Sequence, residues 1–463
     1  MNPATLAAAA LFAALRAYAQ FNVPGPDFPL MAAVISGDAA AVEKLLKGGA
    51  DPNKGNKGSF MGIPPLSAAF MWPNAAVLRA LLDAKADIEI RDSRGATPLM
   101  WSVYHDNSDP QLARMLLAAG ASPNAVDANG DSALIHAMRR GNVEAVRVLE
   151  QGGASRDRAI RKSAERAIAL LQKSSPQFTR VSGCVSCHHQ TLPAMAMEAA
   201  REHGIAFDEQ AAAKDVEATV AMWKLGRQLM RAEPFKIPDP PVVVSYALVG
   251  LAAANHPDGE DTAEMARFLG AGQQQDGSWR VMTHRAPLEA FDITATALSI
   301  RAMSLYGNDA APVERAAVWL AGQTARTSEE RSMQLLGLAW AKRTGGTARL
   351  VRELLAKQLP GGGWAQLDVP EADAYATGQA LAALHAAGGL RPGDAAWKRA
   401  VDYLLRTQLK DGSWLVVSRS HPFQPYKESG FPHGKDQWIS ASGTSWAALA
   451  LSLSAGEPVS RAR

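Results

Sequence analysis

The chain has little cysteine, no excess of one charge and no long apolar run in its interior. Only two of its 463 residues are cysteines, so a disulfide framework does not hold the fold together. The 48 Lys and Arg residues nearly balance the 45 Asp and Glu residues, and a net charge of +3 is too small for a nucleic-acid footprint. We therefore expect no nucleic-acid partner. Beyond the N-terminus, no stretch reaches the roughly 18 apolar residues of a membrane span, so we expect no transmembrane segment in the mature chain.

What the chain does contain indicates several globular domains. With 47% apolar and 20% charged residues, it can bury ample surface. At about 150 residues per domain, a chain of 463 residues suggests two to four domains.

The first residues have features of an export signal. An apolar run over residues 4–15 precedes a small-x-small sequence at 17–19, which suits cleavage by a signal peptidase. No Lys or Arg precedes the run, so a plain N-terminal helix is the alternative. We expect residues 1–19 to be a signal peptide and the mature protein to be periplasmic or otherwise exported.

A period of about 34 residues follows. Leu30, Leu66, Leu99 and Leu134 recur at intervals of 36, 33 and 35 residues, the third within Thr97-Pro98-Leu99. The second half of each unit ends in small residues, at 48–53, 84–89, 119–124 and 152–155. These units resemble ankyrin repeats over residues 27–155. The resemblance implies about four stacked helix pairs and a surface that binds a protein partner.

Segments with helical periodicity fill the rest of the chain. Six Ala-rich segments are predicted to be inner helices, at about 189–203, 241–255, 291–306, 330–343, 372–387 and 441–454. Six other segments alternate with them and are predicted to be outer helices, at about 157–172, 208–230, 260–271, 310–323, 346–358 and 393–407. A strict alternation of six and six favours a closed double ring, because closure leaves no apolar end uncovered. Asp292 and Asp373, which begin two inner segments, are predicted to cap them.

Three near copies of one motif stand between these helices: QQQDGSW (273–279), KQLPGGGW (357–364) and TQLKDGSW (407–414). They resemble the repeats of squalene-hopene cyclases and prenyltransferase β-subunits, whose shared fold is the α/α toroid. The resemblance implies that the Gln and Trp residues are structural. We therefore expect an all-α chain with an ankyrin solenoid, an (α/α)6 toroid over 156–455 and a tail at 456–463.

The chain departs from both toroid families in its chemistry. No Asp-x-Asp-Asp string occurs, which argues against terpene cyclase activity. The prenyltransferases hold zinc with residues late in the toroid, whereas Cys184 and Cys187 precede the first inner helix. A cavity inside the ring would still suit an apolar small molecule.

The two cysteines form the string Cys184-Val185-Ser186-Cys187-His188, which is followed by His189. Cys-x-x-Cys-His is typical of c-type haem attachment, in which the thiols bond to the haem vinyl groups and the His is the proximal iron ligand. The string resembles a cytochrome c motif, and it implies one covalent haem c on Cys184, Cys187 and His188. Export agrees with this, because bacterial haem c is attached outside the cytoplasm.

The expected function is electron transfer or haem-dependent redox chemistry, with the ankyrin repeats for protein binding. Three alternatives for the cysteines stay open: a zinc site on Cys184, Cys187 and His188, a redox disulfide, and structural thiols. A non-catalytic protein-interaction scaffold is a further alternative. No catalytic residue is identified, and if the chain is an enzyme we expect a haem-dependent oxidoreductase.

The alternation of helices also nominates a distal iron ligand, because every loop from an outer to an inner helix lies at the same end of the ring. The candidates at that end are His284, His421, His433 and Met282, with Met195 and Met197 as further thioethers. The irregular segment 415–440, which holds two of these histidines, is predicted to be a lid or binding loop.

Overall fold

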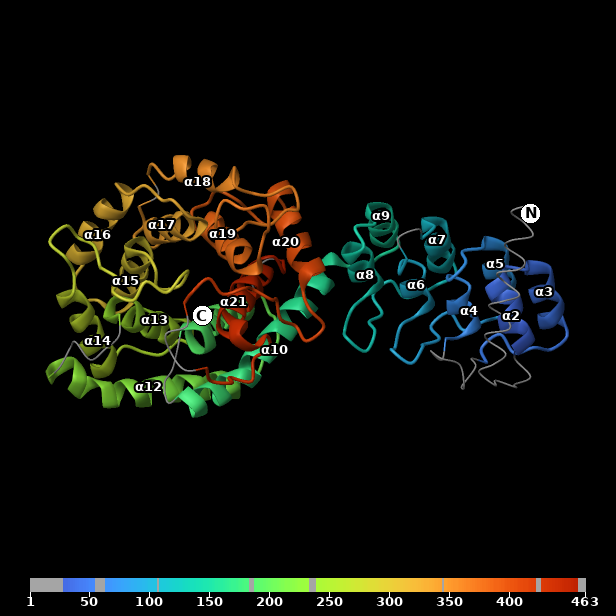
Figure 1. Cartoon of the computed structure of the whole chain (residues 1–463), viewed down its shortest axis with the longest axis horizontal. Helices are drawn as coiled ribbons and strands as arrows, with labels where there is room; N and C mark the ends of the chain where they lie inside the picture. Colours follow the sequence, from blue (N-terminus) through green and yellow to red (C-terminus); the bar gives the residue numbers. More distant parts are fainter. Residues whose placement is uncertain are drawn as a thin grey trace. The chain divides into compact units, whose positions relative to one another are not determined.

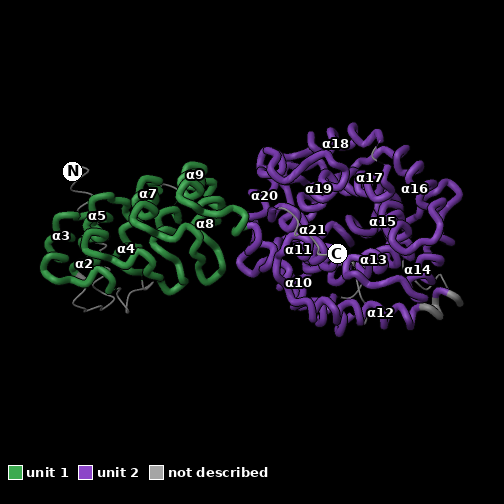
Figure 2. The backbone as a smooth tube through the Cα atoms, turned by 180° about the vertical axis from the view of Figure 1, so that it is seen from behind, with its two compact units in different colours: residues 1–159 green, residues 160–463 purple. Residues whose placement is uncertain are grey.

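The computed structural model describes residues 28–54, 63–105, 108–182, 187–232, 239–343, 345–421 and 426–456. In these ranges the regular structure is helical, with isolated β-bridges and no strand, so the predicted all-α class is confirmed. The predicted signal peptide at 1–19 lies outside the described residues. The chain divides into two compact units, residues 1–159 and 160–463, shown in different colours in Figure 2.

Unit 1 is a stack of helix pairs. The pairs are α2 (Phe28–Ser36) with α3 (Ala39–Lys47), α4 (Pro65–Ala68) with α5 (Ala75–Asp83), α6 (Pro98–Trp101) with α7 (Pro110–Ala118), and α8 (Ala133–Arg139) with α9 (Val143–Gln151). The first helices α2, α4, α6 and α8 pack against one another in that order (Figure 1). The four periodic leucines are buried in this stack. Each pair therefore covers the apolar face of its neighbour.

The second helix of each pair begins at a residue suited to capping. Asp and Asn side chains are favoured there because their oxygen accepts a hydrogen bond from a backbone N–H of the first turn, which has no helical partner. The four N-caps that do so are Asp38, Asn74, Asp109 and Asn142.

Hydrogen bonds between loops join successive pairs. The Ser122 N–H donates to Glu89 Oε1 over 2.6 Å, and the Ser155 N–H donates to Asn124 Oδ1 over 2.7 Å. These partners lie 33 and 31 residues apart in the sequence, which is the spacing of the repeat. The period seen in the sequence is thus a repeated contact in the structure.

Unit 2 is a double ring of helices (Figure 1). The outer helices are α10 (Arg156–Ser182), α12 (Glu209–Ala232), α14 (Glu260–Ala271), α16 (Ala311–Ala321), α18 (Ala348–Leu355) and α20 (Ala395–Thr407). The inner helices are α11 (Leu192–Glu202), α13 (Pro240–Ala253), α15 (Asp292–Tyr306), α17 (Ser328–Trp340), α19 (Ala374–Ala386) and α21 (Gln437–Leu453). Each inner helix packs against the next, and α21 packs against α11, so the inner ring closes. We call the end of the ring where the inner helices begin the mouth end.

The inner and outer helices of the ring differ in how much of their surface is buried and in the size of their residues. In α15, α19 and α21 most residues are buried, because each of these helices packs against two inner neighbours and against outer helices. The outer helices α16 and α20 bury only one face. Small residues therefore dominate the inner layer, where helices approach one another closely.

The repeated Gln and Trp residues are structural, as predicted: each Gln joins two outer helices, and each Trp bonds back to the outer helix that precedes it. The Trp279 indole N–H donates to Leu269 O in α14 over 2.8 Å, and Gln273 Nε2 donates to Pro312 O at the start of α16 over 2.8 Å. The other two copies repeat these bonds, with Trp364 to Leu354 O, Gln358 to Ala396 O, Trp414 to Leu404 O and Gln408 to Ser163 O.

The third copy closes the outer ring. Gln408, at the end of α20, is 3% exposed, and its Nε2 donates to Ser163 O in α10 over 2.9 Å. Gly412 follows in a left-handed conformation, with φ of 94°. A Cβ atom there would lie 2.8 Å from Arg166 O of α10, so only glycine fits this approach. The last outer helix is thereby bound to the first.

One of the two predicted caps is correct. Asp373 is the N-cap of α19, and its Oδ1 accepts a hydrogen bond from Ala376 N over 2.9 Å. The prediction for Asp292 is wrong, because Asp292 is the first residue of α15, Phe291 stands at the N-cap, and no side chain makes a capping hydrogen bond there. Its carboxylate instead accepts from Val281 N over 2.9 Å and pairs with Arg280 at 2.7 Å. The carboxylate oxygens of Asp292 therefore bond to the loop that precedes α15, and they do not bond to backbone N–H groups of the helix.

Candidate functional site at the mouth end

His188 and His189 lie at the mouth end, and the structure describes part of the motif to which they belong. Residues 183–186, which include Cys184, lie outside the described residues, and so does the side chain of Cys187. The chain continues as one turn of π-helix, Cys187–Thr191, which runs directly into α11. π-helical turns are rare in proteins, and many of those that occur lie at functional sites. His188 and His189 both lie on this turn.

Aromatic rings surround the two histidines. The His189 ring is 0% exposed and stacks on Phe178 of α10, with centroids 4.5 Å apart and planes 9° apart. The Phe431 ring is nearly perpendicular to the His189 ring, with centroids 6.2 Å apart. The His188 ring stacks on Trp438 of α21 at 5.6 Å, with planes 9° apart. We call Phe178, Phe431 and Trp438 the aromatic cluster.

Sequence reasoning missed the aromatic cluster. Its members come from an outer helix, a loop and the last inner helix, and packing of α21 against α11 brings Trp438 to His188. No spacing in the sequence relates them to His188. The one available signal was the position of Phe431 and Trp438 inside the segment 415–440, which was predicted to be a binding loop.

Both histidines are held neutral. Burial lowers the pKa of His189 to about 3. Burial, followed by the nearby His189 and the positive charge of Arg285, lowers the pKa of His188 well below its usual value. An imidazole must be unprotonated to bind a metal ion, so both rings are in the ligating state at neutral pH.

The two imidazoles face each other. The Nδ1 atoms of His188 and His189 are within hydrogen-bonding distance, and the rings are nearly perpendicular, with an interplanar angle of 79°. Two neutral imidazoles that meet in this way form a hydrogen bond in which one Nδ1 donates and the other accepts.

The four candidate distal ligands lie in mouth-end loops. His284 Nδ1 hydrogen-bonds with Ala290 O at 3.1 Å, and His433 Nε2 hydrogen-bonds with Ser413 Oγ at 2.8 Å. Met282 is 61% exposed, and His421 is also exposed. The structure thus brings together His188, His189 and the aromatic cluster, while His284 and His433 have hydrogen-bond partners of their own.

Within the described ranges, no three side chains of His, Cys, Asp or Glu are grouped so as to hold a metal ion. Both cysteine side chains fall outside those ranges. Met195 and Met197 lie on α11, and Met197 is buried.

A buried polar cluster lies at the same end of the ring. Glu329, in the first turn of α17, is 2% exposed. The Tyr375 hydroxyl of α19 donates to its Oε2 over 2.9 Å, and the Thr294 hydroxyl of α15 donates to its Oε1 over 3.2 Å. Burial raises the pKa of Glu329 to about 7, although these bonds and one from Gln379 oppose the rise. Sequence reasoning did not identify this acid.

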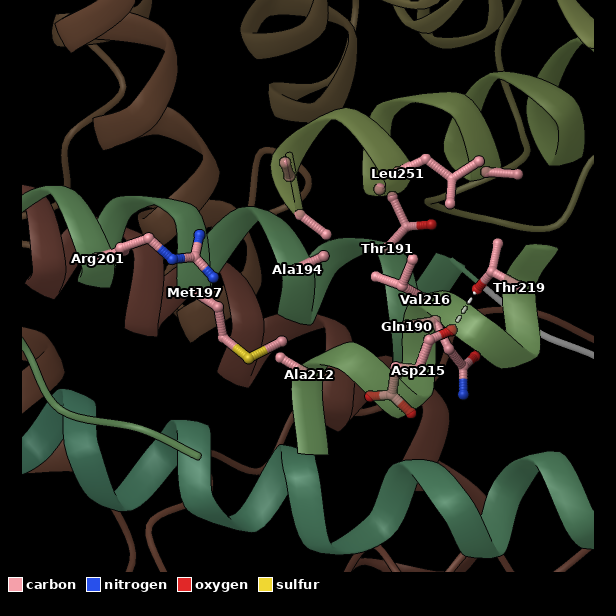
Figure 3. A pocket seen from close by; sticks show the side chains of 14 residues that line it. Gln190, Thr191, Ala194, Met197, Arg201, Ala212, Asp215, Val216, Thr219 and Leu251 are labelled. Carbon is pink, nitrogen blue, oxygen red and sulfur yellow. Dashed lines mark hydrogen bonds between the residues drawn. The ribbon is translucent and has the colours of Figure 1, made fainter. Parts of the chain in front are cut away.

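A small pocket lies between α11, α12 and α13 (Figure 3). Its polar lining includes Gln190, Thr191 and Asp215, and burial raises the pKa of Asp215 to about 6 against a hydrogen bond from Ser175. Its volume is about 30 Å³, which is room for one or two water molecules. This pocket is therefore far too small for a porphyrin or a polyprenyl chain.

Exposed apolar side chains of unit 2 gather toward the mouth end. Among its described residues, the large apolar side chains that are more than a third exposed lie in the second half of an outer helix or in the loop that follows. They are Val181, Leu225, Met282, Val318, Leu367, Val369, Leu409, Leu415, Val417 and Tyr426.

Comparison with known families identifies unit 1. Residues 30–127 match the family described as "Ankyrin repeats (3 copies)", and residues 107–150 match "Ankyrin repeats (many copies)". Residues 30–150 are ankyrin repeats. The predicted repeat array is thereby confirmed. Within the ranges that the structure describes, no helix combines the length and apolar character needed to cross a bilayer.

Curated relatives are similar to a quarter or so of the chain. A Danio rerio protein named "Putative palmitoyltransferase ZDHHC13" is 32% identical over 130 residues, which cover 28% of this chain and 20% of that protein. The Arabidopsis thaliana E3 ubiquitin-protein ligase KEG is 30% identical over 99 residues (21% and 6%). Human neurogenic locus notch homolog protein 2 is 35% identical over 120 residues (26% and 5%). The chain thus spans a fifth or less of the length of these relatives.

Proposed function

We propose that this chain is a protein-binding scaffold whose ankyrin repeats hold a protein partner. The observation that carries the proposal is the match of residues 30–150 to ankyrin repeats. Stacked repeats of this kind present an extended surface that suits a protein better than a small molecule.

A patch of cationic and aromatic side chains on the repeats is the proposed binding site for the protein partner. The guanidinium groups of Arg94 and Arg140 both lie over the Tyr104 ring, with each Cζ 5.3 Å from its centroid. His136 also faces Tyr104, at 5.8 Å. Both arginines are exposed, and Tyr and Arg are the side chains that contribute most often to binding energy at protein interfaces.

Site-specific photo-crosslinking tests the scaffold proposal. A photoreactive amino acid at position 94 or 140 of the full chain should crosslink to a defined protein in cells that produce it. The same amino acid at Val143, which is 70% exposed on the second helix of its pair, is the matched control. Equal crosslinking from all three positions, or no product that binds the purified chain, would overturn the proposal.

We infer that unit 2 is an α/α toroid of the type found in squalene-hopene cyclases and prenyltransferase β-subunits. Three copies of the Gln and Trp motif with matching hydrogen bonds support this inference. The apolar side chains toward the mouth end would suit the entry of an apolar molecule. An experimental structure in which α11 and α21 are apart would refute the toroid.

A second candidate function is favoured by the neutral His188 beside the two cysteines. We propose that Cys184, Cys187 and His188 attach one haem c at the mouth end, and that residues 1–19 direct export to the periplasm, where attachment takes place. The residues fit the group, because His188 is unprotonated and the aromatic cluster supplies apolar surroundings. A bound haem would supply one-electron transfer. Zinc on the same three residues is the alternative.

Covalent attachment gives a direct test. The full chain, produced together with haem-attachment machinery, should keep a haem stain through denaturing electrophoresis. The variant Cys184→Ala/Cys187→Ala should lose the stain. A colourless wild-type chain would refute the haem candidate, and stoichiometric zinc without iron would decide for the zinc site.

A further inference from the structure

We propose that His189 is a positioning residue that accepts a hydrogen bond from the Nδ1–H of His188. This bond fixes the tautomer of His188 and makes Nε2 its metal-binding nitrogen. The inference deepens the haem candidate, or its zinc alternative, and its functional meaning rests on one of them.

The first step is that packing fixes the plane of the His189 ring. The ring is 0% exposed, with Phe178 stacked on one face at 4.5 Å and the Phe431 ring nearly perpendicular to it at 6.2 Å. Phe178 belongs to α10, and Phe431 belongs to the segment before α21, so two separate elements hold the ring. The plane of the His189 ring is therefore set by packing, and within that plane Nδ1 lies against Nδ1 of His188.

The second step is that His188 is held on two sides. Trp438 stacks on its face at 5.6 Å, and Nδ1 of His189 meets its own Nδ1. The contact between the two Nδ1 atoms uses one nitrogen of His188 and turns the other, Nε2, away from His189. Adjacent residues of one helical turn make this contact, so it forms with little loss of chain entropy.

The third step decides which ring donates. A neutral imidazole carries a proton on one nitrogen and a lone pair on the other. If His189 donated, Nε2 of His188 would carry a proton and could not bind a metal ion. Metal-binding histidines almost always donate their other N–H to a fixed acceptor, which sets the tautomer and raises the basicity of the ligand. Nδ1 of His189 is that acceptor here.

The tautomer can be measured without any metal. In the haem-free full chain with ¹⁵N-labelled histidine, long-range ¹H–¹⁵N correlation spectra show which ring nitrogen carries the proton. We expect His188 to be protonated at Nδ1 and unprotonated at Nε2. A proton on Nε2 of His188 in the wild-type chain would overturn the inference.

Two variants separate hydrogen bonding from packing. His189→Phe keeps a flat ring against Phe178 but removes the acceptor, so His188 should become a mixture of tautomers. His189→Asn places an amide oxygen near the position of Nδ1 and should restore the wild-type tautomer. An unchanged tautomer in His189→Phe would contradict the inference. If His189→Phe does not fold, the wild-type spectrum and His189→Asn still decide.

The haem-bound protein gives an independent readout. Loss of the acceptor lowers the basicity of His188 and should shift the reduction potential of the haem to more positive values in His189→Phe, with a return toward wild type in His189→Asn. The two proposals fail separately. A wild-type chain that takes up no haem refutes the haem candidate alone, whereas haem attachment with the other tautomer refutes the role of His189 alone.

Discussion

At the scale of single residues, burial decides the protonation of the acid at the mouth end. Glu329 has hydrogen-bond donors on both oxygens, yet burial raises its pKa to about 7. An ordinary Glu titrates near 4.3 in an unfolded chain. The folded protein therefore binds a proton at Glu329 over a pH range in which the unfolded chain does not.

This difference predicts how stability depends on pH. Because the folded pKa is raised, the contribution of Glu329 is fully present below about pH 4.5 and is lost as the pH rises through about 7. Glu329→Gln should remove that loss and be more stable than the wild type at pH 8, by an amount on the order of 3 kcal/mol. Urea unfolding of both proteins at pH 5 and pH 8 measures the difference. A gain of equal size at both pH values would contradict this prediction.

The candidate ligands could be identified from the sequence, but the aromatic residues that surround His188 could not. The string from Cys184 to His188 identified the candidate ligands, because the chemistry of thiols and imidazole depends on local spacing. Phe178 and Trp438 lie far from each other in the chain and reach His188 only through the tertiary fold. The partnership of His188 with His189 depends on a π-helical turn, which has no recognisable sequence signal.

At the scale of helices, periodicity predicted which segments are helical better than where they end. The predicted end of α10 at residue 172 is ten residues short of Ser182. Ser174, Ser175 and Pro176 suggest a helix end, since Pro lacks a donor and Ser competes for backbone bonds. The helix nevertheless continues, and Leu171 in it packs with Phe431 and Ala441. Tertiary packing thus overrides the local signal.

The cap of α19 yields a prediction with an internal control. Asp373→Ala removes the acceptor for Ala376 N and should lower the free energy of unfolding by about 1 kcal/mol. Asp373→Asn keeps an acceptor at the same position and should remain near the wild-type value. Thermal unfolding of the three proteins at one pH makes the comparison, and an equal loss in Asn and Ala would show that the cap is not the cause.

At the scale of the whole molecule, the third copy of the Gln and Trp motif differs from the first, because only the third joins the last outer helix to the first outer helix. Gln273 is partly exposed and joins two outer helices that are near in sequence. Gln408 is buried and joins α20 to α10, across 245 residues. The six-and-six alternation in the sequence suggested closure, but which side chains make it was not predictable, because Ser163 carries no motif.

The two glutamines should therefore differ in their effect on stability. Gln408→Ala leaves the buried Ser163 O and Gly412 O without this donor and should lower the free energy of unfolding by about 2 kcal/mol or more. Gln273→Ala, whose acceptors are nearer to solvent, should cost about 1 kcal/mol. Chemical unfolding followed by tryptophan fluorescence compares them. Equal losses would mean that joining α20 to α10 adds nothing to stability.

Contact between α21 and α11 has a consequence for biosynthesis. A ribosome delivers α11 early and α21 last, so every nascent chain of intermediate length carries inner helices whose apolar sides have no neighbour. The inner ring of unit 2 can close only after α21 has left the ribosome. A chain stalled before α21 should be a target for chaperones and proteases, whereas the ankyrin unit, whose contacts are all local, can fold as it emerges.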